Sequence, residues 1–481
     1  MTRLVPRVVI SGMSGDSGKT LVSLALLLAL RERGMAVRAF KKGPDYIDAA
    51  WLAWASGAPA RNLDTFLAGF DGVSQAFSRY AVQTAGEATG AGLNVIEGNR
   101  GLFDGMDAEG THSTAALAKL LGAPVVLVLN ARKMTGTAAA LVRGCQVLDP
   151  DVRIAAVVLN QVAGRRHEAV AREAIERASG VPVVGAIPRL DENVLPGRHL
   201  GLVTPLEHAG IDRLADALRD ITQRCLDIDG LLSHAANHSG SDFRLATANH
   251  SAAANHSRSG FTSRAVTIGY LSDSAFSFYY PDNLEALEAQ GATLVPWSSL
   301  SGNPLPPGLD ALYIGGGFPE THASALEGNR ALGESLRAAA TEGLPIYAEC
   351  GGLMLLANAV TWQGRRHAMA GVLPIDVEVC AVPQGHGYVV LGVDRPNPFF
   401  TVGREIRGHE FHYSRITGPV PDTACEVCRG TGCGGGRDAI VANNVWASYT
   451  HVHAAGMPDW AEGLVAAARR YQQHRRPSNQ A

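Results

Sequence analysis

Short runs of consecutive apolar residues recur along the first half of the chain and alternate with stretches of helical pattern. These runs are apolar at nearly every position rather than at every second one, which is typical of strands buried on both faces of a sheet. We therefore predict an α/β unit with a mostly parallel sheet covered by helices. The predicted strands are residues 7–12, 36–40, 93–98, 123–130, 153–160 and 181–188, and the first predicted helix is residues 19–34.

The pattern changes between about Ser233 and Ser263, where Ser, Ala, Asn and His replace large apolar residues and the tetrapeptide ANHS occurs three times. This composition favours a flexible, solvated linker. Its histidines, His238, His250 and His256, could bind a metal, but low-complexity connectors of this kind seldom do.

Apolar runs resume after this segment, and the part from about 371 to 416 is richest in strand pattern. The further predicted strands are residues 265–273, 311–317, 344–352 and 387–393. We therefore expect two α/β domains, residues 1–232 and 264–481, joined by a linker of residues 233–263.

Composition narrows the class of protein. A length of 481 residues suits two or three domains, and a net charge of −3 gives no reason to expect nucleic acid or an anionic membrane as partner. The first residues run directly into a strand without an apolar signal core, and the apolar run at 21–30 is too short to span a bilayer. Seven cysteines do not suggest a disulfide scaffold, so we expect a cytoplasmic protein with reduced thiols.

A glycine-rich segment, SGMSGDSGKT at residues 11–20, lies between the first predicted strand and the first helix. Glycines let backbone N–H groups face a phosphate, and the helix N-terminus adds a favourable dipole. Lys19 would reach the terminal phosphates and Thr20 would hold Mg²⁺. The strict P-loop pattern needs glycine where Met13 stands, so the loop is a variant. The predicted nucleotide-binding residues are Gly15, Asp16, Ser17, Gly18, Lys19 and Thr20; the alternative is a glycine-rich turn that only caps a helix.

Acidic residues follow two further strands of this domain. Asp45 lies in KKGPDYID, just past one strand, whereas Glu97 ends another and Asp104 lies in the loop after it. Since ligands collect at the carboxyl ends of parallel strands, these side chains can converge near the γ-phosphate and hold Mg²⁺ or orient a nucleophile. The alternative is that they cap loops, although a carboxylate that ends a buried strand is costly without a partner.

The second domain carries a thiol at a sharp turn. In LPIYAECGGLMLL a buried strand turns at Cys350 and a helix follows at once, which predicts a displayed nucleophile whose pKa the helix N-terminus lowers. The loop YIGGGFPE supplies Gly316 and Gly317 as candidate oxyanion donors. A base is still needed, and the candidates are His409, His412, His451 and His453, each of which alone could be a buried structural histidine.

Along the chain, seven motifs follow one another in this order: SGKT, KKGPDYID, EGNRGLFDG, GGGFPE, AECGG, GHEFHYS and SYTHVH. In this order the chain resembles the cobyrinic acid and hydrogenobyrinic acid a,c-diamide synthases, over nearly its whole length except the linker and the tail. The resemblance implies a dethiobiotin-synthetase-like P-loop domain and a class I glutamine amidotransferase domain of flavodoxin-like fold. It also implies amidation of the a and c acetate carboxylates of a corrinoid precursor with ATP, Mg²⁺ and glutamine.

The resemblance also assigns roles to residues. Cys350 matches the glutaminase nucleophile and His451 the histidine that activates it, while no HxE motif supplies the glutamate of a full triad. Thr20, Asp45 and Glu97 are the implied metal ligands. Asp45, Glu97 and Asp104 match acidic residues important for synthetase activity, and Tyr46 and Ile47 lie where the family tunes the choice of carboxylate. The implied partners are a tetrapyrrole, glutamine and ATP, and a homodimer stays open as the assembly.

Two features depart from the resemblance. Asn130 ends a strand where the family usually has Asp, which would weaken or relocate a Mg²⁺ contact. The segment CEVCRGTGCGGGRD adds Cys425, Cys428 and Cys433, a spacing that could hold iron–sulfur or zinc if a fourth ligand were found. We narrowly favour an inert surface loop between two strands.

Two other functions remain open at this stage. A cysteine-bearing branch could act on another tetrapyrrole, which makes siroheme amidation the closest alternative. A P-loop switch of the partition-ATPase type is more distant, because a switch has no use for a thiol elbow in a second domain. Release of glutamate from glutamine separates a synthetase from a switch.

Overall fold

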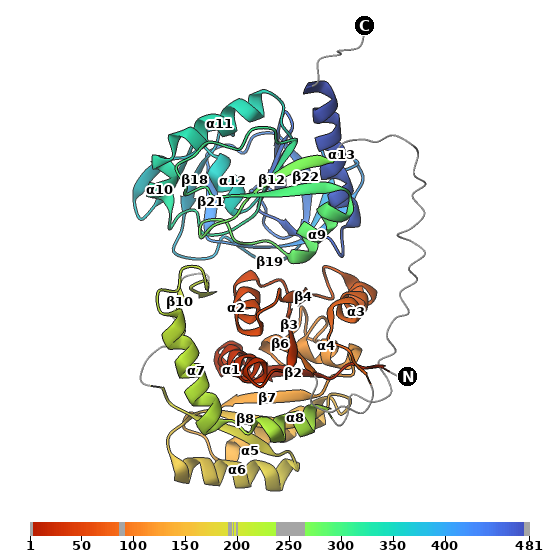
Figure 1. Ribbon diagram of the computed structural model, residues 1–481, viewed down its shortest axis with the longest axis vertical. Helices are drawn as coiled ribbons and strands as arrows, with labels where there is room; N and C mark the ends of the chain where they lie inside the picture. Colours follow the sequence, from red (N-terminus) through yellow and green to blue (C-terminus); the bar gives the residue numbers. More distant parts are fainter. Residues whose placement is uncertain are drawn as a thin grey trace. The chain divides into compact units, whose positions relative to one another are not determined.

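The computed structural model describes residues 3–85, 92–190, 195, 197–198, 201–236 and 265–475, and its helices and strands are labelled in Figure 1. Contacts divide the described residues into two compact units: those up to 236 other than Phe66–Ala68 form the first, and those from 265 onward, with Phe66–Ala68, form the second. Within the described ranges, no helix is both long and apolar enough to cross a membrane.

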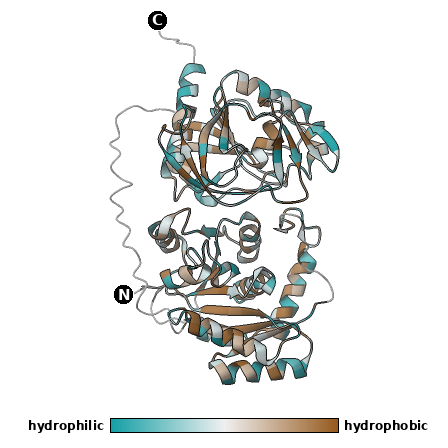
Figure 2. Ribbon diagram, turned by 180° about the vertical axis from the view of Figure 1, so that it is seen from behind, coloured by the Kyte–Doolittle hydropathy of each residue, from teal (hydrophilic) through white to brown (hydrophobic). Residues whose placement is uncertain are grey.

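The first unit is built on a seven-stranded sheet in which every neighbouring pair is parallel. In spatial order its strands are β4 (Arg61–Leu63), β3 (Ala36–Lys42), β6 (Gly92–Gly101), β2 (Arg7–Gly12), β7 (Val125–Asn130), β8 (Ile154–Val162) and β9 (Val183–Pro188). All six residues of β2 are buried, and Figure 2 colours this sheet largely hydrophobic. The predicted parallel sheet is therefore confirmed.

Helices pack around this sheet, and α1 contacts both α2 and α7 while α5 contacts α6. Their bounds are α1 (Lys19–Glu32), α2 (Tyr46–Ser56), α3 (Gly69–Tyr80), α4 (Thr114–Leu120), α5 (Gly136–Leu148), α6 (Arg165–Ser179), α7 (Ile211–Cys225) and α8 (Ile228–Ala236). Short pieces complete the unit: β1 (Arg3–Leu4), the 3₁₀ turn η1 (Gly15–Ser17), β5 (Thr84–Ala85), β10 (Gly197–Arg198) and β11 (Gly201–Leu202).

The second unit has a mixed ten-stranded sheet and a separate four-stranded sheet. In spatial order the large sheet contains β13 (Ala292–Trp297), β12 (Val266–Leu271), β14 (Ala311–Ile314), β15 (Ile346–Glu349), β24 (Val445–Ser448), β23 (Arg437–Ala442), β22 (Thr423–Arg429), β19 (Gly385–Val393), β20 (Glu405–His412) and β25 (His451–Val452). The first five are parallel neighbours and the rest pair antiparallel.

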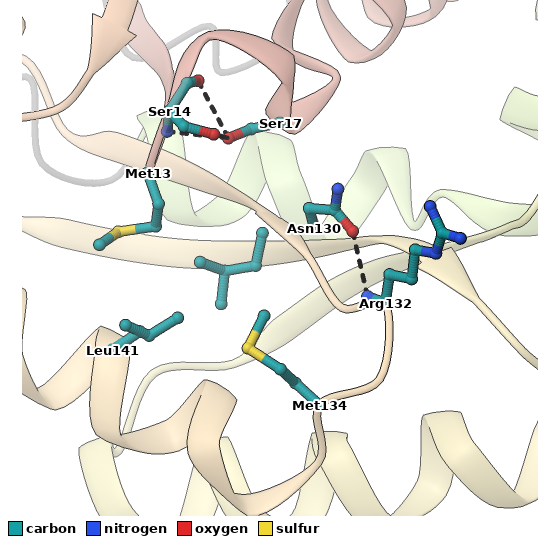
Figure 3. Close-up of a pocket in the computed structure, with 8 residues that line it drawn as sticks. Met13, Ser14, Ser17, Asn130, Arg132, Met134 and Leu141 are labelled. Atoms are coloured by element: carbon teal, nitrogen blue, oxygen red, sulfur yellow. Dashed lines mark hydrogen bonds between the residues drawn. The ribbon is translucent and has the colours of Figure 1, made fainter.

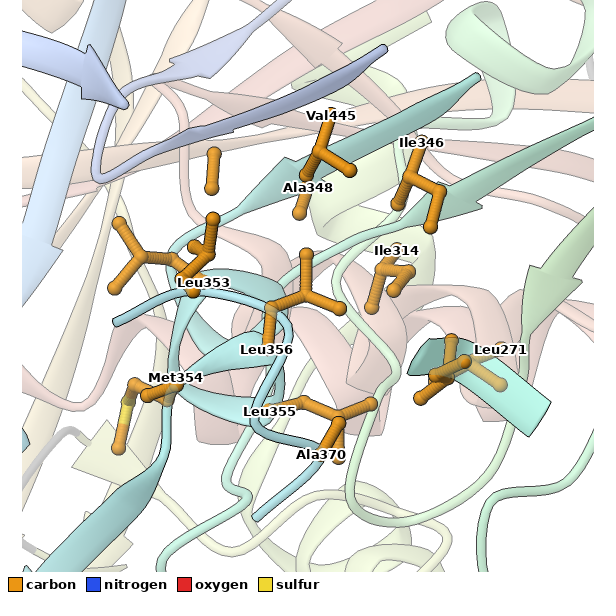
Figure 4. Close-up of a cluster of buried hydrophobic side chains, with 14 of the residues drawn as sticks. Leu271, Ile314, Ile346, Ala348, Leu353, Met354, Leu355, Leu356, Ala370 and Val445 are labelled. Atoms are coloured by element: carbon orange, nitrogen blue, oxygen red, sulfur yellow. The ribbon is translucent and has the colours of Figure 1, made fainter. Parts of the chain in front are cut away.

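The small sheet contains β17 (Arg365–Ala368), β16 (Ala359–Trp362), β18 (Asp376–Val379) and β21 (Ser414–Thr417), so the strand-rich character expected near 371–416 is confirmed. The helices are α9 (Pro281–Ala289), α10 (Ala323–Gly328), α11 (Arg330–Thr341), α12 (Gly351–Leu356) and α13 (Pro458–Arg475). Every residue of α12 is buried, and Figure 4 shows its leucines packed against Ile314, Ile346 and Val445 of the sheet.

Two predicted segments, the linker and the cysteine-rich segment, differ from the structure, and most of the linker lies outside the described residues. Helix α8 continues through Ala236, four residues into the predicted linker, and residues 237–263 of that linker lie outside the described residues. The cysteine-rich segment is not a surface loop, because residues 423–429 and 437–442 form β22 and β23 inside the large sheet. Within TACEVCR the first three residues, including Cys425, are buried, whereas Glu426 and Cys428 are exposed.

Candidate active sites

The phosphate loop joins β2 to α1 and depends on two glycines. Gly12 lies so close to Ser17 that a β-carbon at residue 12 would be 2.6 Å from Ser17 Cβ. Gly18 has a φ of 95° and lies against Asn160, whose Nδ2 donates to Ser17 O at 3.0 Å. The two glycines that the loop conformation requires are therefore Gly12 and Gly18, which explains why Met13 is tolerated between them.

Lys19 begins α1 and is buried beneath this loop. Its Nζ donates to Ser14 O at 2.7 Å and to Gly15 O at 3.2 Å. Burial, and after it the nearby charge of Lys41, lower the pKa of Lys19 to about 8, although the neighbouring carboxylates raise it. The ammonium group of Lys19 therefore lies at the loop, where it could donate a hydrogen bond to a terminal phosphate oxygen.

A buried ion cluster lies beside the loop and was not predicted from the sequence. Lys41 Nζ, on β3, donates to Asp48 Oδ2 at 2.6 Å and to Glu97 Oε1 at 2.9 Å. Glu97, on β6, is fully buried and also accepts from Thr20 Oγ1 at 3.0 Å. Burial disfavours the Lys41 charge, but Asp48 and Glu97 outweigh it and hold its pKa well above the usual value.

The other predicted acidic residues hold local structure. Asp45 is the N-cap of α2, and its Oδ1 accepts from the Asp48 N–H at 2.8 Å. Burial, together with the charge of Asp48, raises the pKa of Asp45 to about 7. Asp104 Oδ2 accepts from Gly101 N–H at 2.8 Å in the loop after β6. Asp45 lies within the electrostatic range of Glu97, whereas Asp104 is held by its own loop.

The first turn of α2 contains the two residues expected to tune carboxylate choice. Tyr46 is partly exposed, and Ile47 is buried. A β-carbon at Gly201 would lie 3.6 Å from Ile47 Cδ1, so the side chain borders the segment around β11. Both residues lie in the first turn of α2, and the next residue of that helix, Asp48, belongs to the ion cluster.

The oxygen donors at this edge of the sheet fit Mg²⁺. Thr20 and Glu97 are in hydrogen-bond contact, and Mg²⁺ in phosphate sites is held by one or two protein oxygens plus phosphate and water. No group of three or more His, Cys, Asp or Glu side chains in the described ranges is arranged to hold a metal ion. The set Thr20, Asp45 and Glu97 thus suits a phosphate-bound cation better than a dedicated protein cage.

A pocket of about 360 Å³ adjoins the phosphate loop, as Figure 3 shows. It is lined by Met13, Ser14, Ser17, Leu129, Asn130, Arg132, Met134 and Leu141. Asn130 Oδ1 accepts from the Arg132 N–H at 3.0 Å and so closes the turn after β7. The residue that stands in place of the usual Asp therefore has a structural role at the mouth of this pocket.

The thiol elbow of the second unit is strained. Cys350 follows β15 and has φ 49° and ψ −99°, in the left-handed half of backbone space that a side chain rarely adopts. Its N–H donates to Ser448 O at 2.7 Å, which ties the elbow to β24. The buried α12 fixes the other side of the turn.

The expectation of a lowered thiol pKa was wrong. Burial raises the pKa of Cys350 well above its usual value, and the negative charges of Glu320 and Glu349 raise it further. Burial and these charges raise the thiol pKa by more than the N-terminus of the short helix α12 lowers it. The thiol therefore keeps its proton until a base removes it.

The glycine loop lies against the elbow. A β-carbon at Gly351 would lie 3.1 Å from Gly317 N, and one at Gly316 would lie 2.6 Å from His451 Cε1. Gly317, with φ 157°, approaches Ala275 O so closely that a β-carbon would lie 2.1 Å away. The glycines are therefore required by close approach, and they bring the loop, the elbow and His451 together.

Three buried histidines surround this point. His409 on β20 stacks on His451 with ring centroids 5.0 Å apart. The ring centroids of Tyr280 and His453 are 4.5 Å apart. Burial and the neighbouring His451 and His453 lower the pKa of His409 well below its usual value, so it remains neutral. His412 instead stacks on Tyr449 and contacts Glu410. Among the four predicted candidates, His451 lies against Gly316 of the glycine loop.

Sequence reasoning missed Glu349. Its Oε2 lies 3.3 Å from His451 Nδ1, and the side chain is fully buried. A signal was present, because AECGG places a carboxylate at the end of an otherwise apolar strand, where burial is costly without a partner.

The possible metal site at the three added cysteines is not supported. Cys425 and Cys433 are buried, Cys428 is exposed, and none of the seven cysteines forms a disulfide. Cys433 Sγ donates to Asp438 Oδ1 at 3.1 Å, and Asp438 also accepts from Thr450 Oγ1 at 2.6 Å. Cys433 therefore supports the segment that leads into His451 through Asp438 and Thr450.

Comparison with known proteins covers both units. Residues 8–202 match the family model described as a CobQ/CobB/MinD/ParA nucleotide binding domain, and residues 267–458 match a CobB/CobQ-like glutamine amidotransferase domain. The chain is 43% identical to a protein of Magnetococcus marinus named cobyrinate a,c-diamide synthase, over 96% of this chain and 97% of the relative. Proteins of that name from Methanosarcina acetivorans and Archaeoglobus fulgidus are 38% and 39% identical, over 98% and 93% of this chain and 97% and 94% of theirs.

Proposed function

The chain belongs to the family of cobyrinate a,c-diamide synthases, and from this premise we propose that it amidates the a and c acetate carboxylates of cobyrinate with ATP and glutamine. It is a glutamine-dependent, ATP-using amide ligase of cobalamin biosynthesis. The motif-based resemblance is thereby confirmed. The relatives carry the cobyrinate name, so siroheme amidation has no support among them, and the amidotransferase unit argues against a partition-type switch.

The observation that carries the assignment of roles in the second unit is the convergence of Cys350, the glycine loop and His451. The thiol sulfur attacks the carboxamide carbon of glutamine while its proton passes to His451. The N–H groups of Gly316 and Gly317 stabilise the oxyanion. His451 returns the proton to the departing ammonia, and water then hydrolyses the thioester to glutamate.

In the first unit, a substrate carboxylate attacks the γ-phosphorus of ATP and ADP leaves, giving an acyl phosphate. Lys19 and the backbone from Gly15 to Thr20 hold the phosphates. Thr20 and Glu97 would hold Mg²⁺, which supplies positive charge against the phosphate oxygens when bound. Burial raises the pKa of Glu97, and Lys41, which contacts Glu97, lowers it by a smaller amount. We assign Asp45 and Asp104, with Tyr46 and Ile47, to the handling of the substrate carboxylate. Ammonia displaces phosphate from the acyl carbon to form the amide.

Two variants test this division of labour. Cys350→Ala should abolish amide formation from glutamine but retain it from ammonium salts. Lys19→Ala should retain glutamate release but lose amide formation from both nitrogen sources. Mass spectrometry of products from cobyrinate, hydrogenobyrinate and siroheme, each supplied separately, identifies the macrocycle. Loss of both activities in a folded Cys350→Ala protein, or amidation of siroheme alone, would defeat the proposal.

We further propose a cytoplasmic enzyme that uses only small-molecule substrates and assembles as a homodimer. The inputs are soluble metabolites, and the amidotransferase thiol needs a reducing compartment. Light scattering of the purified chain measures the assembly, and a monomer at working concentration would exclude the dimer.

A further inference from the structure

We infer that Glu349 is the positioning residue of the glutaminase site, and that it takes the place of the triad glutamate that the sequence lacks after the histidine. The inference rests on the proposed roles of Cys350 and His451. It concerns which nitrogen of His451 accepts the thiol proton.

The contacts of Glu349 satisfy both carboxylate oxygens. Its Oε2 lies 3.3 Å from His451 Nδ1, and its Oε1 accepts from the Val452 N–H at 3.2 Å. Tyr313 OH donates to Oε2 at 3.2 Å. Burial, and after it the charge of Glu349, raises the pKa of Tyr313 well above the usual value, so the phenol keeps the proton that it donates. The carboxylate therefore contacts both the ring of His451 and the backbone N–H of the next residue, Val452.

Both oxygens of Glu349 already accept hydrogen bonds, from the Val452 N–H and from Tyr313 OH, so we assign His451 Nδ1 as the donor in the remaining contact. The other ring nitrogen then has a lone pair. A β-carbon at Gly316 would lie 3.3 Å from His451 Nε2, which places this nitrogen on the side of the glycine loop. Glu349 thus selects the tautomer in which Nε2 can accept the thiol proton.

Other aromatic and charged groups near the site have contacts of a different kind. His409 presents a ring face, because it stacks on His451 at an interplanar angle of 22°. Asp282 Oδ2, on α9, lies 3.9 Å from His453 Nε2. Glu320 and Glu410 act on the thiol, whose pKa they raise after burial has done so. Of these groups, Glu349 is the carboxylate that contacts the ring edge.

The fold supplies this arrangement from distant parts of the chain. Glu349 and Ser448 are register partners of the parallel pair β15 and β24, and the next residue, Cys350, donates its N–H to Ser448 O. Three residues beyond Ser448 the chain reaches His451. Nucleophile and positioning carboxylate are therefore consecutive residues, and both are held to the strand that leads into the base.

The test compares Glu349→Gln with a matched control. A glutamine has one acceptor oxygen, so its NH₂ group must oppose either His451 Nδ1–H or the Val452 N–H, and the ring is pushed toward the wrong tautomer. The control is Glu327→Gln, which alters a similar pair in the same unit: Glu327 Oε2 lies 3.0 Å from His367 Nδ1, and Oε1 accepts from Ala368 N–H at 3.1 Å.

We expect Glu349→Gln to lower kcat for glutamate release by about 10²-fold or more, in line with triad carboxylates, with KM for glutamine changed less than about threefold. Glu349→Asp should recover part of the loss, and Glu327→Gln should behave as the unaltered protein. Amidation from ammonium salts should persist in all three variants. An unaltered protein that releases no glutamate would defeat the proposed function instead, so the two failures are distinct.

A spectroscopic measurement does not depend on the variants folding. In ¹⁵N-histidine-labelled protein above the titration of the ring, the His451 signal, assigned by its loss in His451→Asn, should show a protonated Nδ1 and an unprotonated Nε2. A neutral ring protonated at Nε2, or a Glu349→Gln enzyme with the kcat of Glu327→Gln, would overturn the inference.

Discussion

Replacing Lys41 by methionine should destabilise the first unit far more than an ordinary loss of a surface charge. Methionine keeps most of the apolar stem and removes only the cation. It leaves Glu97, with a fully buried side chain, and Asp48, 20% exposed, without the ammonium group that both contact. Removing one partner of a buried ion pair costs about 3–5 kcal/mol, because the remaining charge is uncompensated.

The matched control is Lys119→Met in the same unit. Lys119 Nζ also lies 2.6 Å from a carboxylate, Asp149 Oδ2, but the lysine side chain is 41% exposed. Exposed pairs contribute about 1 kcal/mol or less. At about 2–4 °C per kcal/mol for a unit of this size, Lys41→Met should lower the melting temperature by about 6–20 °C and Lys119→Met by only a few degrees.

Differential scanning calorimetry at neutral pH measures both variants. The pKa of Lys41 is raised, so its contribution is complete below the ordinary lysine value of about 10.4 and is lost only as pH rises through the higher folded-state value. Adding Glu97→Gln to Lys41→Met should restore part of the loss, because the buried charge disappears. Equal shifts for Lys41→Met and Lys119→Met would show that the buried cluster is not held by charge and would refute the reasoning.

Three further predictions follow from the sites. Because burial and Lys41 lower the pKa of Lys19 to about 8, kcat/KM for ATP should fall as pH rises above about 8, and Lys19→Arg should remove that limb; a pH profile without it contradicts the placement of Lys19. The raised pKa of Asp45, about 7, means that wild-type stability should fall as pH rises from about 4 to 7, whereas Asp45→Asn, which keeps the cap, should flatten calorimetric stability across that window. Deleting residues 425–433 removes most of β22 and should unfold the second unit, as measured by circular dichroism. Cys428→Ser should leave glutaminase activity intact, because Cys428 is exposed. Stoichiometric zinc or iron in the purified protein would contradict the structural role of the cysteines.

Sequence patterns predicted well the features that depend only on residues adjacent in the chain. The continuous apolar run of β2, the glycines after it and the helix from Lys19 are all local, and the structure places them within two residues of the prediction. The elbow at Cys350 is local too, since strand, thiol and glycines follow one another. Such signals need no knowledge of the rest of the fold.

The features that were missed depend on residues far apart in the chain. Lys41 and Glu97 are 56 positions apart, and Glu349 and His451 are 102 apart, so no local motif shows that they meet. The thiol pKa failed for the same reason: the helix rule is local, whereas burial by α12 and the nearby carboxylates comes from the fold. The cysteine segment was mistaken for a loop because Gly434, Gly435 and Gly436 dominate its turn, while the strands beside it are recognisable only once the sheet is known.

The pairing of β15 with β24 also sets the order in which the second active site can appear during synthesis. The nucleophile strand emerges about a hundred residues before the strand that holds its elbow and before the base itself. A nascent chain that ends before Val445 has the thiol but neither Ser448 nor His451. Such long-range closure is slow compared with local folding, and it means that hydrolysis of glutamine cannot begin on the ribosome until the whole sheet has been translated. Because the described elements of the first unit end at Ala236, that unit has already been translated when glutamine hydrolysis becomes possible.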